Sequence, residues 1–177
     1  MVRVIVVCYN LAQVFMKYNP GHASYLPVLI KVLQISEGPV LELGSGIYST
    51  PVMHWLCLEA KRRLVTYEND PEIFNMNKDF GTGLHEVKFV EDWDKIPIET
   101  EHWGVVFVDH KPAERRKIEI ARLSKIADYI VVHDTETQRD REYGFIKGAF
   151  PLFKYRFNYR RQKPYTSVLS NFIEFYL

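Results

Sequence analysis

Five polar residues with side chains suited to catalysis follow directly after two apolar segments in the second half of the chain. They are Asp109, His110 and Lys111 after the first segment, and His133 and Asp134 after the second. Both segments are short and rich in valine, which is typical of strands. Open α/β sheets bind ligands at the carboxyl ends of their strands, so these residues are placed to meet a substrate. Histidine is the usual general base near neutral pH, so His110 and His133, together with Lys111, are three candidates for removing a proton.

A second chemical signal is the stretch at positions 39–50, which reads PVLELGSGIYST. Its apolar start predicts a strand buried on both faces. Gly44, Ser45 and Gly46 then predict a tight turn, and Ser or Thr followed by Pro51 predicts a helix start. Such a turn cradles a ligand, because glycine lets the backbone approach and free N–H groups of the helix point at the ligand.

Two acidic residues narrow the class of ligand. Glu42 lies two residues before Gly44, and Glu68 ends the next apolar segment, where a carboxylate would accept both ribose hydroxyls. The dinucleotide fingerprint G-x-G-x-x-G is incomplete because Ser49 stands at its third glycine. A carboxylate beside the glycine turn suits a ligand with an ammonium and a sulfonium better than a ligand with a pyrophosphate.

Hydrophobic patterning and turn signals predict strands that alternate with helices along most of the chain. The predicted strands are Met1–Cys8, Val40–Leu43, Arg63–Tyr67, Glu86–Val90, Trp103–Val108 and Asp128–Val132. The predicted helices are Ser24–Ser36, Pro51–Lys61, 70–78 and Pro112–Lys125. A late antiparallel hairpin is predicted at Leu152–Tyr159 and Thr166–Phe172. This order of elements predicts an α/β fold with a mostly parallel sheet.

The sequence resembles the class I S-adenosylmethionine (SAM)-dependent methyltransferases in the ELGSG of Glu42–Gly46, in the acid-ended second strand and in its order of elements. The resemblance implies a Rossmann-like fold, with a seven-stranded, mostly parallel sheet, helices on both faces and a C-terminal antiparallel hairpin. It implies SAM as the cofactor, bound by Glu42, Gly44, Ser45, Gly46, Glu68, Asp92, Trp93 and Asp109. Asp92 would take the adenine amino group and Trp93 would cover the ring. The alternative for Trp93 is a half-buried aromatic residue in a loop.

The segments VFVDHK and VVHDT are similar to the metal-binding segments of catechol-type O-methyltransferases, which hold Mg²⁺ against the acceptor hydroxyls. The similarity implies Asp109 and Asp134 as metal ligands on neighbouring strands. Two carboxylates that close repel each other unless one is protonated or a cation such as Mg²⁺ lies between them. This chain departs from that pattern at Thr135, where the family has Asn, and at Lys111, which stands one residue early. The alternative is that both aspartates cap loops, or that Asp109 contacts SAM alone.

Length and composition predict one domain, residues 1–177. The chain is 47% hydrophobic and 25% charged with a net charge of +1, which gives no general reason to expect nucleic acid or a membrane as partner. Cys8 and Cys57 lie far apart in apolar surroundings and predict reduced thiols, and the apolar N-terminal run is too short to cross a bilayer. We therefore expect a cytoplasmic protein.

The resemblance implies methyl transfer from SAM to a hydroxyl group of a small-molecule acceptor, and the hydroxyl acceptor rests on the similarity at Asp109 and Asp134 alone. The acceptor pocket is expected to come from the first 25 residues, the loop after Asp134, or a partner subunit in a homodimer. One alternative is an RNA methyltransferase that uses the basic and aromatic tail, with Lys154, Arg156, Arg160, Arg161 and Lys163. Strand alternation accounts for this tail without a ligand, with aromatic residues on the core face and basic residues in solvent. Another alternative is a non-catalytic subunit with the SAM-binding fold.

Overall fold

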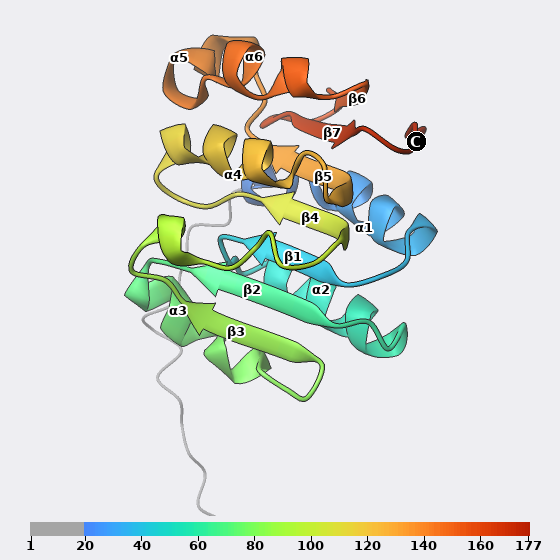
Figure 1. Cartoon of the computed structure of the whole chain (residues 1–177). Coiled ribbons are helices and arrows are strands. Elements are labelled where there is room, and N and C mark those ends of the chain that lie inside the picture. Colours follow the sequence, from blue (N-terminus) through green and yellow to red (C-terminus); the bar gives the residue numbers. More distant parts are fainter. Residues whose placement is uncertain (1–19) are drawn as a thin grey trace, which may run out of the picture.

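Within residues 20–177, which the structure describes, seven strands form one sheet in the order β3-β2-β1-β4-β5-β7-β6 (Figure 1). The structure is a computed structural model. The strands are β1 Val40–Leu43, β2 Leu64–Glu68, β3 His85–Phe89, β4 Trp103–Val108, β5 Ala127–His133, β6 Tyr155–Tyr159 and β7 Thr166–Ser170. Strands β1 to β5 run parallel, and β7 runs antiparallel to both β5 and β6. The predicted mostly parallel sheet and C-terminal hairpin are confirmed, whereas the strand predicted at Met1–Cys8 lies outside the described residues.

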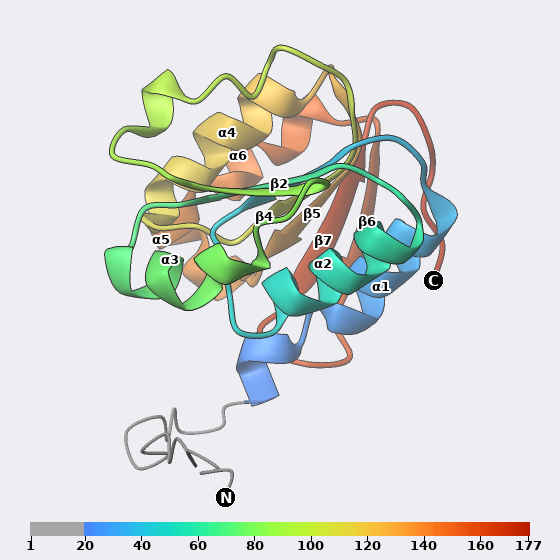
Figure 2. The ribbon, with the colours of Figure 1, turned by 90° about the horizontal axis from the view of Figure 1, so that it is seen from below.

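Helices cover both faces of the sheet, as the view from below shows (Figure 2). The α-helices of the described residues are α1 Leu26–Ile35, α2 Ser49–Glu59, α3 Pro71–Asn77, α4 Arg116–Leu123, α5 Asp140–Tyr143 and α6 Phe145–Gly148. Short 3-10 turns precede α1 at Pro20–Ala23 and α4 at Ala113–Arg115. Within these bounds, none of the helices has the length and apolar composition that a bilayer crossing requires.

The central strand β4 is buried along its whole length, because helices pack on both sides of it. Phe107 shares one buried cluster with Met53 of α2 and with the apolar face of α1. Val106, which points to the opposite face, shares a second cluster with Ile120 of α4 and with Phe145 of α6. Successive side chains of a strand alternate between faces, so one apolar run serves both layers of the core.

Two parts of the chain differ from the sequence-based prediction. The helix predicted from Pro112 begins as a 3-10 turn, and its α-helical part starts at Arg116. The segment between β5 and β6 contains α5 and α6, which sequence patterning does not predict. Helices of four residues are too short to show a period of 3.6, and they depend on tertiary packing for stability. Here Tyr143 and Phe145 supply that packing, since both are buried and their rings stack with centroids 5.0 Å apart.

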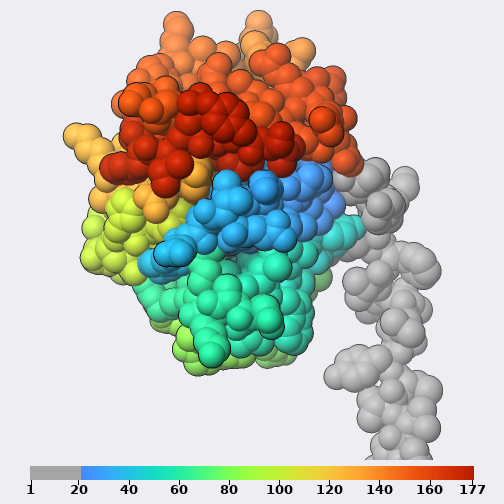
Figure 3. Space-filling view, turned by 90° about the vertical axis from the view of Figure 1, so that its right-hand side faces the viewer, coloured from blue at the N-terminus to red at the C-terminus, as the bar shows by residue number. Residues whose placement is uncertain are grey.

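The C-terminal hairpin completes the face that α1 covers. Figure 3 shows the C-terminal segment lying against α1, and Phe175 and Tyr159 belong to the same buried cluster as that helix. On β6, Arg156 is exposed while Tyr159 is buried. The hairpin therefore places its aromatic residues toward the core and its basic residues toward solvent, as strand alternation predicts.

Candidate functional site

A cleft of about 1080 Å³ lies at the carboxyl ends of β1, β4 and β5. The lining residues that the sequence analysis singled out are Gly46, Asp109, Lys111, His133 and Asp134. His22 and Tyr25 at the start of α1 and Lys163 in the loop between β6 and β7 also line it. Tertiary structure thus brings together residues of the glycine loop and of two neighbouring strand ends, on the side of the sheet where open α/β folds bind ligands.

The glycine loop between β1 and α2 is shaped by a close approach of two backbones. Gly44 adopts a φ of +89°, which residues with a side chain rarely adopt. A Cβ atom on Gly44 would lie 2.5 Å from Cα of His110, because the chain leaving β4 passes directly against the loop. Glycine is therefore required at position 44, both by the positive φ and by the close approach of His110.

Glu42 supports this loop from beneath and does not line the cleft. Its carboxylate is fully buried and accepts hydrogen bonds from Thr50 Oγ1 at 3.0 Å and from Thr66 Oγ1 at 2.7 Å. The Thr50 hydroxyl in turn accepts the Gly46 N–H at 3.0 Å. Burial raises the pKa of Glu42 to about 7, because the loss of water outweighs the hydrogen bonds from Ser49, Thr66 and Thr50.

Glu68 braces the same loop from the end of β2. Its carboxylate accepts four hydrogen bonds, from the Ser45 N–H at 2.7 Å, the Ser45 hydroxyl at 3.0 Å, and the N–H groups of Asn69 and Asp70 at 2.8 and 2.7 Å. A carboxylate has about four lone-pair sites. The predicted role of Glu68 as a ribose ligand remains a prediction, and in this conformation it would require the exchange of protein donors for ribose hydroxyls.

Arg116, at the start of α4, bridges the two aspartates that follow β4 and β5. Its Nη2 lies 2.9 Å from Oδ1 of Asp109, and its Nη1 lies 3.1 Å from Oδ2 of Asp134. The same guanidinium donates to the backbone carbonyl oxygens of His110 at 2.7 Å and Asp109 at 2.9 Å. The Arg116 side chain lines the cleft but is only 6% exposed, so these ion pairs are largely shielded from solvent.

Asp134 has two further partners on the helical segment that follows β5. Tyr143 Oη donates to its Oδ2 at 2.8 Å, and Arg139 pairs with its Oδ1. Asp134 itself adopts a φ of +63°, which Asp tolerates better than most residues. Two arginines and a tyrosine therefore hold this carboxylate in place.

His133 is held at both ring nitrogens. Nδ1 lies 3.2 Å from Oδ2 of Asp109, and Nε2 lies 3.0 Å from Oγ of the buried Ser24. The Ser24 hydroxyl donates its single proton to the carbonyl oxygen of Pro164 at 2.6 Å, so Nε2 is the donor to Ser24. Burial acts to raise the pKa of Asp109, but the neighbouring His133 and Arg116 together outweigh burial, so the pKa of Asp109 lies below its usual value. Both ring nitrogens of His133 are therefore engaged, Nδ1 by Asp109 and Nε2 by Ser24.

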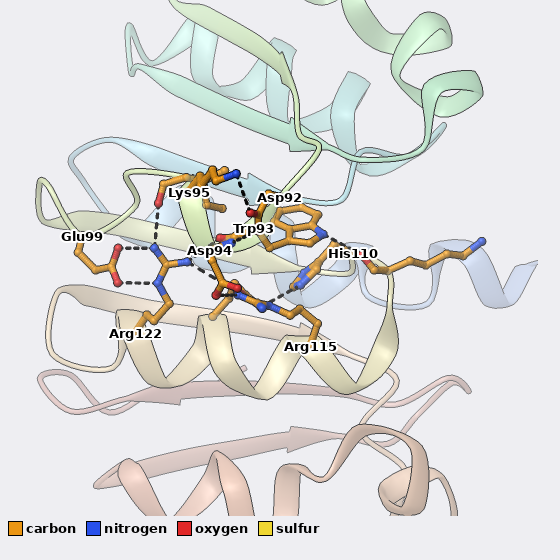
Figure 4. A network of polar contacts seen from close by, with 11 residues as sticks. Asp92, Trp93, Asp94, Lys95, Glu99, His110, Arg115 and Arg122 are labelled. Atoms are coloured by element: carbon orange, nitrogen blue, oxygen red, sulfur yellow. Dashed lines mark hydrogen bonds and ion pairs between the residues drawn. The ribbon is translucent and has the colours of Figure 1, made fainter.

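His110 and Trp93 belong to a network of polar contacts that includes Arg115 at the start of α4 (Figure 4). The centroids of the two rings lie 4.3 Å apart, and His110 Nε2 pairs with the buried Glu119 at 3.2 Å. Trp93 donates its Nε1 proton to the carbonyl oxygen of Lys111 at 3.0 Å. Burial lowers the pKa of His110 despite the nearby Glu119. Neither ring lines the cleft, and within residues 20–177 His110 Nδ1 has no partner.

The two remaining predicted site residues lie apart from each other. Asp92 caps the 3-10 turn Trp93–Lys95 by accepting the Asp94 N–H at 3.0 Å, and it lines a separate hollow beside β3. Lys111 is exposed and lines the cleft. Within the described residues, its ammonium group has no hydrogen-bond or ion-pair partner.

The predicted metal site has suitable ligand atoms, but its carboxylate oxygens already accept hydrogen bonds from other side chains. Asp109, His133 and Asp134 each offer a ligand atom within 4.8 Å of the others, as a metal centre requires. Arg116 already lies between the two carboxylates, however, and a divalent ion about 4 Å from a guanidinium is repelled by roughly 8 kcal/mol at an effective dielectric constant of about 20. The donor set therefore does not fit a divalent cation while Arg116 holds this position.

Sequence reasoning missed the residues that organise the cleft: Ser24, Tyr25, Arg116, Arg139 and Tyr143. Arg116 stands among five charged residues at the start of a predicted helix, where an exposed arginine is the ordinary expectation. Its burial would be detectable only from the strand order, which places the start of α4 beneath the ends of β4 and β5.

No protein-family model matches the chain, and no curated protein matches its sequence. Solved structures match its fold. An O-methyltransferase from Bacillus cereus in complex with SAH has a TM-score of 0.58 at 16% identity, over 86% of this chain and 82% of that chain. A protein from Klebsiella pneumoniae described as an O-methyltransferase has a TM-score of 0.56 at 16% identity, over 89% and 83%. An RNA methyltransferase from Salinibacter ruber in complex with S-adenosyl-L-homocysteine has a TM-score of 0.50 at 15% identity, over 83% and 93%. These similarities show that the chain has the Rossmann-like class I methyltransferase fold.

Proposed function

We propose that the protein is a SAM-dependent methyltransferase that acts on a hydroxyl group of a small molecule. The observation that carries the proposal is the braced glycine loop, which lines one cleft together with Asp109, Lys111 and His133. Sites for small ligands usually measure roughly 300–1,000 Å³. A cleft of about 1080 Å³ therefore has room for a nucleoside cofactor and a small acceptor together.

The cleft residues suit SAM in charge and shape. Gly46 lines the cleft without a side chain, and the loop around it is fixed from below by Thr50. Asp109 is 24% exposed and presents a carboxylate whose pKa is lowered, so it offers a negative charge to an ammonium or sulfonium group. When bound, SAM supplies an activated methyl group, whose S–CH₃ bond breaks as an O–CH₃ bond forms and the hydroxyl proton leaves.

Lys111 is the best placed of the three candidate bases to act on that proton. His110 is buried and does not line the cleft, and both ring nitrogens of His133 are already engaged, by Asp109 and by Ser24. Lys111 lines the cleft and its side-chain nitrogen is open. In its neutral form Lys111 accepts the proton, and in its charged form it stabilises the acceptor oxyanion. His133 is then a positioning residue, and Asp109 serves the cofactor.

Isothermal titration of the full chain with SAM, S-adenosylhomocysteine and NAD⁺ tests the proposal. We expect binding of the first two and no binding of NAD⁺, because the third glycine of the dinucleotide fingerprint is absent. Gly46→Leu, which places a side chain into the cleft, should abolish SAM binding, and Gly83→Leu on an exposed turn is the matched control. Binding of NAD⁺ without any binding of SAM would overturn the proposal.

RNA methylation is a second candidate, favoured by one observation. Lys163 lines the cleft, and Arg160 and Arg161, which precede it in the turn between β6 and β7, are exposed, as are Lys154 and Arg156. Basic residues at the cleft suit a phosphate backbone. Retention of RNA that weakens steeply with added salt, and that Lys163→Glu reduces, would favour this acceptor. Absence of retention at low salt would exclude it.

A further inference from the structure

We propose that the Arg116 guanidinium takes the place of a divalent cation between Asp109 and Asp134, so that methyl transfer in this protein needs no metal ion. The activity part of this inference rests on the proposed methyl transfer. Its metal-binding part concerns the protein alone and is testable without any substrate. The inference starts from a problem that the sequence poses, because two carboxylates at neighbouring strand ends repel each other unless a positive charge lies between them.

Arg116 solves that problem with a fixed charge. One nitrogen contacts Asp109 at 2.9 Å and another contacts Asp134 at 3.1 Å, so a single planar group spans both carboxylates. A guanidinium remains charged at every physiological pH and presents five donors in a rigid fork. Its remaining donors reach backbone oxygens of His110, Asp109 and His133, which ties the ends of β4 and β5 together. Arg116 therefore neutralises and positions the two carboxylates in one step.

The second carboxylate oxygen of Asp109 and that of Asp134 also have partners. His133 Nδ1 lies 3.2 Å from the second oxygen of Asp109, and Arg139 contacts the second oxygen of Asp134. Tyr143 adds a hydrogen bond at 2.8 Å to the oxygen of Asp134 that Arg116 contacts. A metal ion would have to compete with four donors that already engage the two carboxylates, namely Arg116, His133, Arg139 and Tyr143. Asp109, which faces the cleft, keeps enough exposure to meet a positively charged ligand group.

Manganese binding distinguishes this inference from the alternative that Asp109 and Asp134 hold a divalent cation. The full chain is titrated with Mn²⁺, and the free ion is followed by electron paramagnetic resonance. We expect no specific binding by the wild-type protein at millimolar Mn²⁺. Arg116→Ala removes the group that bridges the two carboxylates and should bind Mn²⁺ at least about tenfold more tightly than wild type, because a positive charge beside the ion is removed. The double variant R116A/D134N should lose that gain.

Two control variants show whether a gain in Mn²⁺ affinity is specific to the loss of the Arg116 guanidinium. Arg122→Ala removes an arginine from the same helix that pairs with Glu99 and with two backbone carbonyl oxygens outside the cleft, and it should bind no Mn²⁺. Arg116→Lys keeps the positive charge but loses the fork, and it should also gain no binding. If Arg116→Ala does not fold by circular dichroism, the wild-type titration still decides the question.

Specific Mn²⁺ or Mg²⁺ binding by the wild-type protein that Asp134→Asn abolishes would overturn the inference. So would an Arg116→Ala protein that folds and gains no affinity for Mn²⁺. In the activity arm, turnover of a hydroxyl acceptor should persist in excess EDTA, and complete loss of turnover that Mg²⁺ restores would also overturn it. Failure of SAM to bind would contradict the proposed function alone and would leave the wild-type metal titration to decide the role of Arg116.

Discussion

Replacement of Glu42 by Gln should change the pH dependence of stability. The Glu42 carboxyl is completely buried, and burial raises its pKa from 4.5 to about 7 in the folded protein. In the unfolded chain the group titrates near its ordinary value. The folded state therefore binds more protons than the unfolded state between these two pKa values, and the free energy of unfolding falls as pH rises through that window.

The size of this loss follows from the difference in pKa. A shift from 4.5 to about 7 corresponds to about 3 kcal/mol, since one pKa unit is about 1.4 kcal/mol. The full contribution is present below the unfolded pKa, is lost progressively up to about 7, and stays lost above it. Gln has no titrating proton, and its amide group can donate and accept beside Thr50 and Thr66 as the protonated acid does. E42Q should therefore gain about 3 kcal/mol relative to wild type between about pH 4 and pH 8.

Urea unfolding of both proteins, followed by tryptophan fluorescence at several pH values, measures this difference by linear extrapolation. Glu59→Gln, on the exposed surface of α2, gives the baseline for the loss of one carboxylate. Taking differences between variants cancels the pH dependence that all other groups contribute. A difference between E42Q and wild type that stays constant over this range would refute the raised pKa and with it the buried support of the glycine loop.

Three further changes test the loop and the cleft. Gly44→Ala should lower the free energy of unfolding, measured in urea, by about 3 kcal/mol or more, because it adds both a strained φ and a contact of 2.5 Å with His110. The control Gly83→Ala should change little, because its added Cβ meets nothing within 4 Å. Equal effects of the two substitutions would contradict the close approach of Gly44 to His110. Glu68→Ala should weaken SAM binding, measured by calorimetry, by about 1–3 kcal/mol, because the Ser45 N–H and hydroxyl lose their acceptor. Glu72→Ala, at an exposed position, is the control. An unchanged affinity for SAM in a folded Glu68→Ala protein would show that the hydrogen bonds between Glu68 and Ser45 do not serve cofactor binding. Lys111→Met should lower kcat by about 10²–10⁴-fold and leave the Kd for SAM unchanged, and an unaltered kcat on a hydroxyl acceptor would remove Lys111 from the proton transfer.

The sequence alone predicted the core of the fold because its signals are local. Apolar runs with turn residues at their ends marked the five parallel strands, and β4 was predicted with its observed bounds. Gly44 was identified as a turn residue from its spacing to the strand before it. The short helices α5 and α6 were not predicted, because four residues carry no readable period and their stability comes from rings that stack in the tertiary fold.

The sequence by itself determined which residue types reach the ligand-binding edge: Asp109 and Lys111 after one strand, and His133 and Asp134 after its neighbour. Which partners these side chains meet was decided by the tertiary structure alone. Arg116 lies at the start of a charged helix, and nothing in its local sequence distinguishes it from an arginine in solvent. The parallel pairing of β4 with β5 brings two carboxylates together, and the crossover helix between these strands begins beneath them. A buried charge is stable only among such partners, and partners distant in sequence are fixed by the order of strands in the sheet.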